Sequence, residues 1–261
     1  MNAKLLRPSL LVLICTMFVS CFSSKGIPYK KKTKTSYTTN VKNNVDHSAW
    51  DQLLKTYVTE DGLVDYKGFK DDRKALNNYV TYLANITPKN NWDFKEQLAY
   101  FINVYNANTI KLIVDYYPVE SIKKVDATLS PFLKKFIYIG DKKFSLADIE
   151  KGILQKMKEP RMHFAINCAS FSCPKLLRDA YTSQNVDELM DKAVKAFINS
   201  DKNKITENTV KLSEIFKWYK KDFLQDSESI IDYINQYANT KISPSAEIAY
   251  IEYDWSLNDI D

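Results

Sequence analysis

The stretch Arg161-Met162-His163-Phe164-Ala165-Ile166-Asn167-Cys168-Ala169-Ser170-Phe171-Ser172-Cys173-Pro174 organises the rest of the chain. It contains one of the two histidines and two of the four cysteines of the sequence. Residues 162–166 are mostly apolar, which predicts a short buried strand that carries His163 as its titratable side chain. The small polar residues that follow predict a loop. A loop that opens from a buried strand holds its side chains in fixed positions, so this stretch indicates a site.

The composition favours a globular domain and argues against two kinds of fold. The chain has 261 residues, of which 45% are hydrophobic, and this is enough for one sizeable core. Only five residues are glycine. That number argues against glycine-rich phosphate loops and against a sandwich with many tight turns. The sequence has no GxGxxG or Walker-type loop and no repeat of fixed period.

The N-terminus resembles a bacterial lipoprotein signal. Lys4 and Arg7 precede an apolar run over 10–19, and a small residue then precedes Cys21. We therefore predict a signal peptide over 1–20 and acylation of Cys21, which attaches the protein to a membrane of the cell envelope, facing the periplasm or the exterior. Ordinary secretion with cleavage nearby is the alternative. The apolar run is shorter than the ~20 residues that a membrane-spanning helix needs.

Residues 21–44 predict a disordered basic tether. Eight of the 37 basic residues and none of the 32 acidic ones lie in 1–44, which leaves 29 basic and 32 acidic residues for 45–261. Such a segment has too little apolar surface to fold. The positive charge of the chain thus belongs to its leader and tether, and we expect no nucleic-acid partner for the domain.

Residues 45–261 predict one helix-rich α+β domain with a small sheet, because no internal linker divides them. Hydrophobic periodicity and turn residues predict the elements. We expect helices over about 46–58, 76–83, 93–117, 145–153, 186–198, 213–219 and 230–237, hairpins over 136–144 and 205–212, and a late strand over 248–253.

The longest helical signal, 93–117, predicts a central buried helix, because its middle is apolar almost all round. Asn103 and Asn106 lie one turn apart on one face of it. A buried amide without a partner costs about 1–3 kcal/mol, so each needs a hydrogen bond. Nearby backbone is one possible partner. Alternatively, this face holds the His163 segment or lines a pocket, and we expect His163 to hydrogen-bond to a polar group of this helix.

Three stretches of the sequence resemble the family called domain of unknown function 547. They are 99–107 (AYFINVYNA), 161–174 (RMHFAINCASFSCP) and 253–258 (YDWSLN), and the hairpin and 148–154 (DIEKGIL) also fit. The resemblance covers about 45–260, although Tyr100 stands where the family more often has Phe. It implies a shared α+β fold in which these stretches converge, and it implies no activity.

One interpretation of the site is a thiol nucleophile. Cys168 would attack an acyl carbon, and His163 would be the base. Asn103, Asn106 or Asn167 would orient the imidazole or contribute to an oxyanion hole. The protein would then be a hydrolase or acyltransferase acting on an envelope peptide or amide. Side chains 163 and 168 point to opposite faces of a continuous strand, so the chain must bend at Asn167.

The other interpretation is a disulfide between Cys168 and Cys173, and we favour it. Once Cys15 is cleaved off and Cys21 is acylated, these two thiols remain in an oxidising compartment. A disulfide over five residues requires the intervening residues to form a compact loop, because a helix or a strand separates the α-carbons too far.

With a disulfide, the protein is a binding or structural module of the cell envelope. Its polar site lies around His163 and Cys168, with contributions from Asn106, Asn167 and Ser170. The partner would be an envelope peptide, glycan or protein, since aromatic residues suit such clefts. We predict no metal and no cofactor, because the paired short spacings of structural zinc sites are absent. The sequence leaves open whether the protein is an enzyme.

Overall fold

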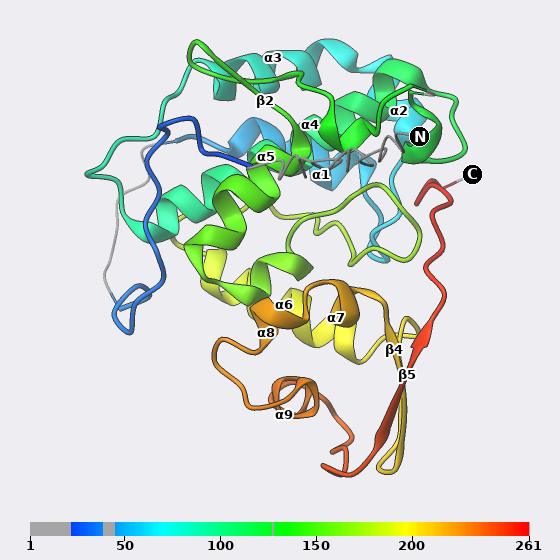
Figure 1. Cartoon of the computed structure of the whole chain (residues 1–261). Coiled ribbons are helices and arrows are strands. Elements are labelled where there is room, and N and C mark those ends of the chain that lie inside the picture. The colour runs from blue at the N-terminus through cyan, green and yellow to red at the C-terminus, as the bar shows by residue number, and fades with distance from the viewer. Residues whose placement is uncertain (1–21, 39–44, 127, 261) are drawn as a thin grey trace, which may run out of the picture.

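Helix α4 (Phe94–Tyr116) runs through the middle of the molecule (Figure 1). The computed structural model describes residues 22–38, 45–126 and 128–260. Asp93 caps α4 by accepting a hydrogen bond from the N–H of Lys95, at 2.9 Å. Of the 23 residues of α4, 20 are buried, so the predicted central buried helix is confirmed.

Three helices precede α4 in the chain, and the second and third of them pack against it. They are α1 (Ser48–Tyr57), α2 (Tyr66–Asp71) and α3 (Arg73–Ala84). The apolar positions that predicted α1 and α3 are the buried ones, which include Trp50 and Leu76. The sequence did not predict α2, because its six residues are too few to show a helical period.

Two small sheets complete the α+β architecture. Strands β1 (Ile137–Ile139) and β2 (Lys142–Phe144) form an antiparallel hairpin. The second sheet has the order β3-β4-β5, with β3 and β4 antiparallel and β4 and β5 parallel. Its strands are β3 (Lys204–Ile205), β4 (Thr209–Ser213) and β5 (Glu247–Ile251). Both hairpins and the late strand are thus where the sequence predicted them.

The remaining helices form the rest of the core. Ser145 and Asp148 form a capping box, and α5 (Leu146–Ile149) then continues as the π-helical turn η3 (Glu150–Leu154). The helix predicted over 186–198 is confirmed as α6. The elements of this part are α6 (Val186–Ile198), α7 (Ile215–Trp218), α8 (Lys220–Phe223) and α9 (Ile230–Asn235). With Phe164, they enclose a second hydrophobic cluster beside the one around α4.

The predicted strand over 162–166 is wrong. Residues Pro160–Phe164 form the 3₁₀ helix η5 instead, which packs against α6. Pro160 occupies the first turn, where its fixed φ suits a helix, and the carboxylate of Glu159 accepts a hydrogen bond from the N–H of Arg161 at 3.1 Å. A run of five mostly apolar residues does not distinguish a strand from a buried helical turn. Here the N-cap Glu159 and Pro160 start a helix.

The described part of the expected tether, residues 22–38, packs on the domain, which corrects the prediction of disorder for this part. Ile27 is buried, and the N–H of Lys32 donates to the carbonyl of Met157 at 2.7 Å. The segment is basic, but Lys25 and Lys32 form ion pairs with carboxylates of the domain. Composition alone does not show such pairs. The predicted signal peptide, Cys21 and residues 39–44 lie outside the described residues. Within the described ranges, no helix is long and apolar enough to cross a membrane.

Candidate functional site

Helix α4 fixes the backbone that leads into the loop at 167–174. The side chain of Asn106 binds this backbone twice: Nδ2 donates to the carbonyl of Ala165 at 2.9 Å, and Oδ1 accepts from the N–H of Asn167 at 2.9 Å. All three residues are buried. The amide of Asn106 is therefore satisfied by backbone, and it sets the position at which the loop begins.

The loop is closed by the side chain of Asn167. Its Nδ2 donates to the carbonyl of Pro174 at 2.8 Å, and its Oδ1 accepts from the N–H of Ala169 at 2.8 Å. Ala169 has φ of 61°, in the left-handed region that costs a non-glycine residue about 1–2 kcal/mol. Such backbone strain persists only where surrounding contacts enforce it, and it concentrates at functional sites. Here it directly follows Cys168.

The C-terminal tail lies along the same loop. Ser170 and Leu257 form an antiparallel bridge, and the N–H of Phe171 donates to the carbonyl of Ser256 at 2.7 Å. The N–H of Asn258 donates to the carbonyl of Ala169 at 3.3 Å. The three motif stretches therefore meet at this loop, as the resemblance implied.

The sulfur of Cys168 lies among hydrogen-bond donors. It is 3.1 Å from Sγ of Cys173, 3.1 Å from Oγ of Ser170 and 3.3 Å from the hydroxyl of Tyr253. Hydrogen bonding from Cys173, with smaller contributions from Ser170 and Tyr253, outweighs the effect of burial and lowers the pKa of Cys168 to about 7. These hydrogen bonds therefore favour the thiolate form of Cys168.

Cys173 has the opposite character. Burial raises the pKa of Cys173 well above its ordinary value, and the neighbouring charge of Cys168 adds to this effect. Burial likewise raises the pKa of Tyr253. Both groups keep their protons and act as donors to the Cys168 thiolate, so the site holds one acidic thiol and one protonated thiol.

Both cysteines are thiols in this structure. Their 3.1 Å separation compares with about 2.05 Å in a disulfide. The compact loop that a disulfide requires is present, because Asn167 holds its two ends together. The disulfide itself stays a prediction.

Cys168, Cys173 and His163 line one cavity of about 580 Å³. The turn after the 3₁₀ helix thus brings the two predicted catalytic side chains to one space, which a continuous strand would not do. The other lining residues are mostly apolar or aromatic. They include Tyr105, Phe132, Leu133, Trp218, Tyr219, Tyr253 and Trp255.

His163 is held by residues that the sequence analysis did not select. Its Nε2 lies 2.8 Å from Oδ2 of Asp222, and its ring stacks on Tyr219 with centroids 3.9 Å apart. Tyr219 in turn donates to Oε1 of Glu150 at 2.7 Å. The Nδ1 atom of His163 is buried and has no hydrogen-bond partner among the described residues. The expected bond between His163 and the polar groups of α4 is wrong, because the Asn103 and Asn106 amides bind backbone.

The other predicted site residues separate into two groups. Asn103 donates to the carbonyl of Tyr181 at 2.7 Å and does not line the cavity, so the structure gives it a structural role. Asn167 and Ser170 line a neighbouring cavity of about 380 Å³ that also includes Cys173. Asn106 lines neither of these two cavities and acts on the loop through the backbone.

Three residues of the site were not selected from the sequence, and only one of them lies in a motif that could have indicated it. Tyr253 lies in the third motif stretch, 253–258. Because the three motif stretches were expected to converge, its position in that stretch could have indicated a place in the site. Tyr219 lies between the short helices α7 and α8, and Asp222 lies in α8. No motif surrounds either residue. Among the residues that the structure describes, no group of three or more His, Cys, Asp or Glu side chains is placed to hold a metal ion.

Residues 89–198 match the family described as "Protein of unknown function, DUF547". The match includes α4, the loop with Cys168 and Cys173, and α6, and it supports the resemblance that the motifs carry. No curated protein matches the chain. No solved structure matches it either.

Proposed function

We propose that this protein is a lipoprotein of the cell envelope in which Cys168 is the nucleophile of an acyl transfer. One observation carries the proposal. The sulfur of Cys168 lies within 3.3 Å of three side-chain donors while it lines the same cavity as His163. A reactive cysteine needs its thiolate stabilised at neutral pH and open to a substrate, and these contacts and the shared cavity support that role for Cys168.

The reaction begins when the Cys168 thiolate attacks the carbonyl carbon of an amide or ester. A carbon–sulfur bond forms, the carbon–nitrogen or carbon–oxygen bond breaks, and the leaving amine or alcohol takes up a proton. In this proposal, Nδ1 of His163 acts as the base that takes up the proton of Cys168 and then passes this proton to the leaving group. The arrangement that supports this role is that Nε2 of His163 is engaged with Asp222, while Nδ1 has no partner within the described residues. Water or an acceptor amine then cleaves the thioester and restores the thiol.

The sequence before residue 22 supports the envelope location. Residues 18–21 resemble a lipobox that ends at Cys21, and the apolar run over 10–19 has the length of the hydrophobic core of a signal peptide. Acylation of Cys21 would attach the domain to a membrane. Mass spectrometry of the mature N-terminus tests this part, and an unmodified N-terminus at another residue would exclude it.

A binding module is the second candidate, and the proximity of the two sulfurs favours it. A disulfide between Cys168 and Cys173 would need them to move together by only about 1 Å, from 3.1 Å. The loop would then be a rigid wall of an aromatic-lined cavity suited to a peptide or glycan. Since a disulfide consumes the thiolate, the two candidates make opposite predictions for Cys168.

Trapping of an acyl-enzyme distinguishes these candidates. The purified protein would be incubated with p-nitrophenyl acetate, with and without a mild reductant, and digested for mass spectrometry. We expect an acetyl group on the Cys168 peptide in wild type and none in Cys168→Ser. If Cys168 stays unacylated while thiol titration shows it to be free, acyl transfer is excluded.

A further inference from the structure

The N-terminal segment leads to the mouth of the thiol cavity. Phe22, the first described residue, is one of the residues that line this cavity. Its carbonyl accepts a hydrogen bond from Nζ of Lys156 at 3.0 Å, and Nζ of Lys151 lies 5.3 Å from the centre of its ring. Phe22 therefore has specific contacts beside the cavity that contains Cys168.

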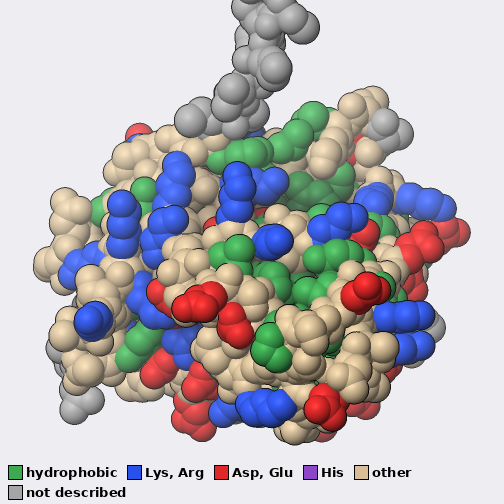
Figure 2. All heavy atoms as spheres, turned by 60° about the horizontal axis from the view of Figure 1, so that its bottom comes forward, with side chains coloured by type: hydrophobic (Ala, Val, Ile, Leu, Met, Phe, Trp, Pro, Cys, Tyr) green, Lys and Arg blue, Asp and Glu red, His purple; other side chains and the backbone are tan. Residues whose placement is uncertain are grey.

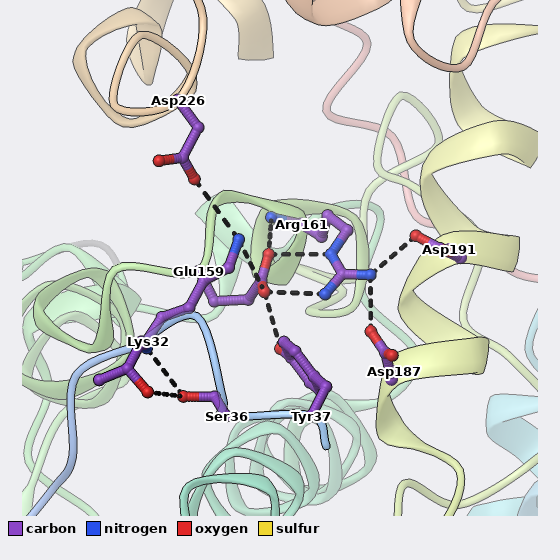
Figure 3. Close-up of polar contacts among 9 residues, drawn as sticks. Lys32, Ser36, Tyr37, Glu159, Arg161, Asp187, Asp191 and Asp226 are labelled. Carbon is purple, nitrogen blue, oxygen red and sulfur yellow. Dashed lines mark hydrogen bonds and ion pairs between the residues drawn. The ribbon is translucent and has the colours of Figure 1, made fainter.

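A buried charge cluster fixes the other end of this segment (Figure 3). The carboxylate of Glu159, which is fully buried, accepts a hydrogen bond from the hydroxyl of Tyr37 at 2.7 Å and lies 3.4 Å from Nζ of Lys32. The guanidinium of Arg161 donates to both oxygens of Glu159, at 2.9 and 2.8 Å. Burial opposes ionisation of Glu159, but hydrogen bonds and charge from Arg161 outweigh it and keep its pKa below the ordinary value.

Further contacts lie between the two ends. Ile27 is buried in the main hydrophobic cluster, and Nζ of Lys25 lies 3.3 Å from the carboxylate of Asp148 in α5. The N–H of Lys30 donates to the side chain of Gln97 at 2.7 Å. The segment is thus held along its length, and the place at which the chain reaches residue 22 is determined by the fold.

Cys21 directly precedes Phe22 in the sequence, so a lipid on Cys21 would be attached next to a residue that lines the cavity. Adjacent α-carbons are about 3.8 Å apart, so an acylated Cys21 lies one residue from a side chain that lines the cavity. A lipid on Cys21 would leave no spacer between the membrane and the cavity mouth, because the basic segment that could have served as a spacer packs back on the domain.

The rim of the cavity has the chemistry of a membrane interface. Leu133 and Trp218 both line the cavity, and yet they are 42% and 43% exposed. Lys151 adds a cation at the same rim. Tryptophan and leucine insert among lipid headgroups, and lysine pairs with lipid phosphates. Figure 2 shows one face of the molecule, on which hydrophobic side chains lie among lysine, arginine and acidic side chains.

We infer that the cavity takes its acyl substrate from the membrane to which Cys21 is attached, and that this substrate is the acyl ester of a membrane lipid. The inference rests on the proposed function, whose substrate class it names. The apolar and aromatic lining would hold the acyl chain. The Cys168 thiolate would attack the ester carbonyl, the carbon–oxygen bond would break, and the lysolipid would leave with a proton while the chain stays as a thioester.

The test uses the full mature lipoprotein in vesicles of phosphatidylethanolamine and phosphatidylglycerol that contain a brominated lipid. Bromine quenches tryptophan fluorescence at the membrane, and Trp218 is the exposed tryptophan of the rim. We expect quenching in wild type that Trp218→Phe largely removes. The matched control places a tryptophan on the exposed β3–β4 turn, as Asn208→Trp in the Trp218→Phe background. This turn lies at the end of the molecule away from α5 (Figure 1), so we expect no added quenching.

A second measurement tests the entry of the substrate. N-hexadecyl bromoacetamide in the vesicles alkylates a thiolate by forming a carbon–sulfur bond and releasing bromide, and iodoacetamide does the same from solution. The double variant Lys32→Gln/Tyr37→Phe removes two contacts of Glu159 and replaces no residue that lines the cavity. We expect the long-chain reagent to alkylate Cys168 at least roughly tenfold faster in wild type than in this variant, because docking raises the effective concentration. The iodoacetamide rates should be equal.

The outcomes separate the inference from the proposed function. If Cys168 reacts with iodoacetamide but Trp218 is no more quenched than the control tryptophan and the long-chain reagent shows no preference, the membrane substrate is excluded and acyl transfer remains. If Cys168 reacts with neither reagent, the nucleophile is excluded. Quenching of Trp218 would then still establish that the cavity mouth faces the membrane.

Discussion

The acidity of Cys168 depends on neighbouring side chains and not on a helix dipole. The residue follows a 3₁₀ helix, so it lacks the helix N-terminus that lowers the pKa of many catalytic thiols. The hydrogen bond from Cys173 lowers the pKa of Cys168 most, burial opposes this effect, and Ser170 and Tyr253 lower the pKa further. A site built in this way is sensitive to the loss of a single donor, and that sensitivity can be measured.

The first prediction concerns Cys173. Replacing it with alanine removes the main donor to the thiolate, so the pKa of Cys168 should rise from about 7 toward its ordinary value. The midpoint of the pH–rate profile for alkylation of Cys168 by iodoacetamide should move upward. Cys173→Ser is the matched control, because its hydroxyl can still donate, and its midpoint should stay closer to wild type. Equal profiles for the alanine and serine variants would contradict this explanation.

The second prediction concerns His47, which is buried and bonded through Nδ1 to the hydroxyl of Tyr79 at 2.7 Å. Burial lowers the pKa of His47 from 6.5 to about 4. Between these two pH values the unfolded chain therefore binds more protons than the folded protein. The contribution of His47 to the free energy of unfolding is complete above pH 6.5 and is lost as the pH falls to 4. The loss should be roughly 3 kcal/mol.

Urea unfolding at pH 7 and pH 4 measures this contribution. His47→Gln carries no titratable group, so the difference in unfolding free energy between the two pH values should be smaller in the variant than in wild type. The same difference in both proteins would show that His47 does not titrate in this way.

At the scale of elements, the sequence predicted most of the helices and hairpins because their patterns are long or carry turn and cap residues. The bounds of α6 and the buried face of α4 follow directly from such patterns. Short elements were harder. The apolar run at 162–166 suggested a strand, while the start signal at Glu159 and Pro160 produced a 3₁₀ helix.

The candidate site was predicted in part for the same reason. Motif residues such as His163, Cys168 and Cys173 were found, and the structure places all three on one cavity. Asp222 and Tyr219 are brought to His163 by tertiary packing from a segment more than 50 residues away, as the 59-residue separation of Asp222 shows. No local pattern encodes such a contact, so it required the fold.

The third prediction compares two asparagines of α4. Asn106→Ala leaves the carbonyl of Ala165 and the N–H of Asn167 without partners in a buried position, which should destabilise the protein by roughly 2–4 kcal/mol. It should also displace the loop and slow the alkylation of Cys168. Asn103→Ala is the matched control one turn away. It removes bonds to Tyr181 at a similar cost, but the reactivity of Cys168 should not change.

Urea unfolding and iodoacetamide kinetics on the two variants provide the readouts. If both substitutions lower the free energy of unfolding but neither changes the alkylation rate of Cys168, the loop is positioned by contacts other than those of α4. If both substitutions slow the alkylation of Cys168 equally, the slower reaction results from general destabilisation of the protein and not from displacement of the loop.

At the scale of the whole molecule, the packed N-terminal segment connects the predicted anchor to the site. It has apolar contacts through Ile27 and charged ones through Lys25 and Lys32. The domain would then have a defined orientation on the membrane in place of free rotation on a tether. The charged cluster around Glu159 is the part of this attachment that a single substitution can release.

The fourth prediction tests this cluster. Glu159→Gln removes the buried negative charge that pairs with Arg161 and Lys32, and such a loss costs roughly 3–5 kcal/mol. Segment 22–38 should then become accessible, so limited trypsin digestion should cleave it at its lysines earlier than in wild type. Asp226→Asn is the control, because Asp226 is exposed and its ion pair with Lys32 should contribute under about 1 kcal/mol. Equal cleavage rates in the two variants would show that Glu159 does not hold the segment.

The most direct test of the thiol site is the pH dependence of Cys168 alkylation in wild-type protein isolated from an oxidising compartment. Iodoacetamide would be added across a range of pH without reductant, and the labelled and linked peptides would be mapped by mass spectrometry. The proposed nucleophile predicts labelling of Cys168 with a midpoint near pH 7 and little labelling of Cys173, whose pKa is raised by burial. A linked Cys168–Cys173 peptide with no labelling of Cys168 would contradict it and would favour the disulfide-stapled binding module.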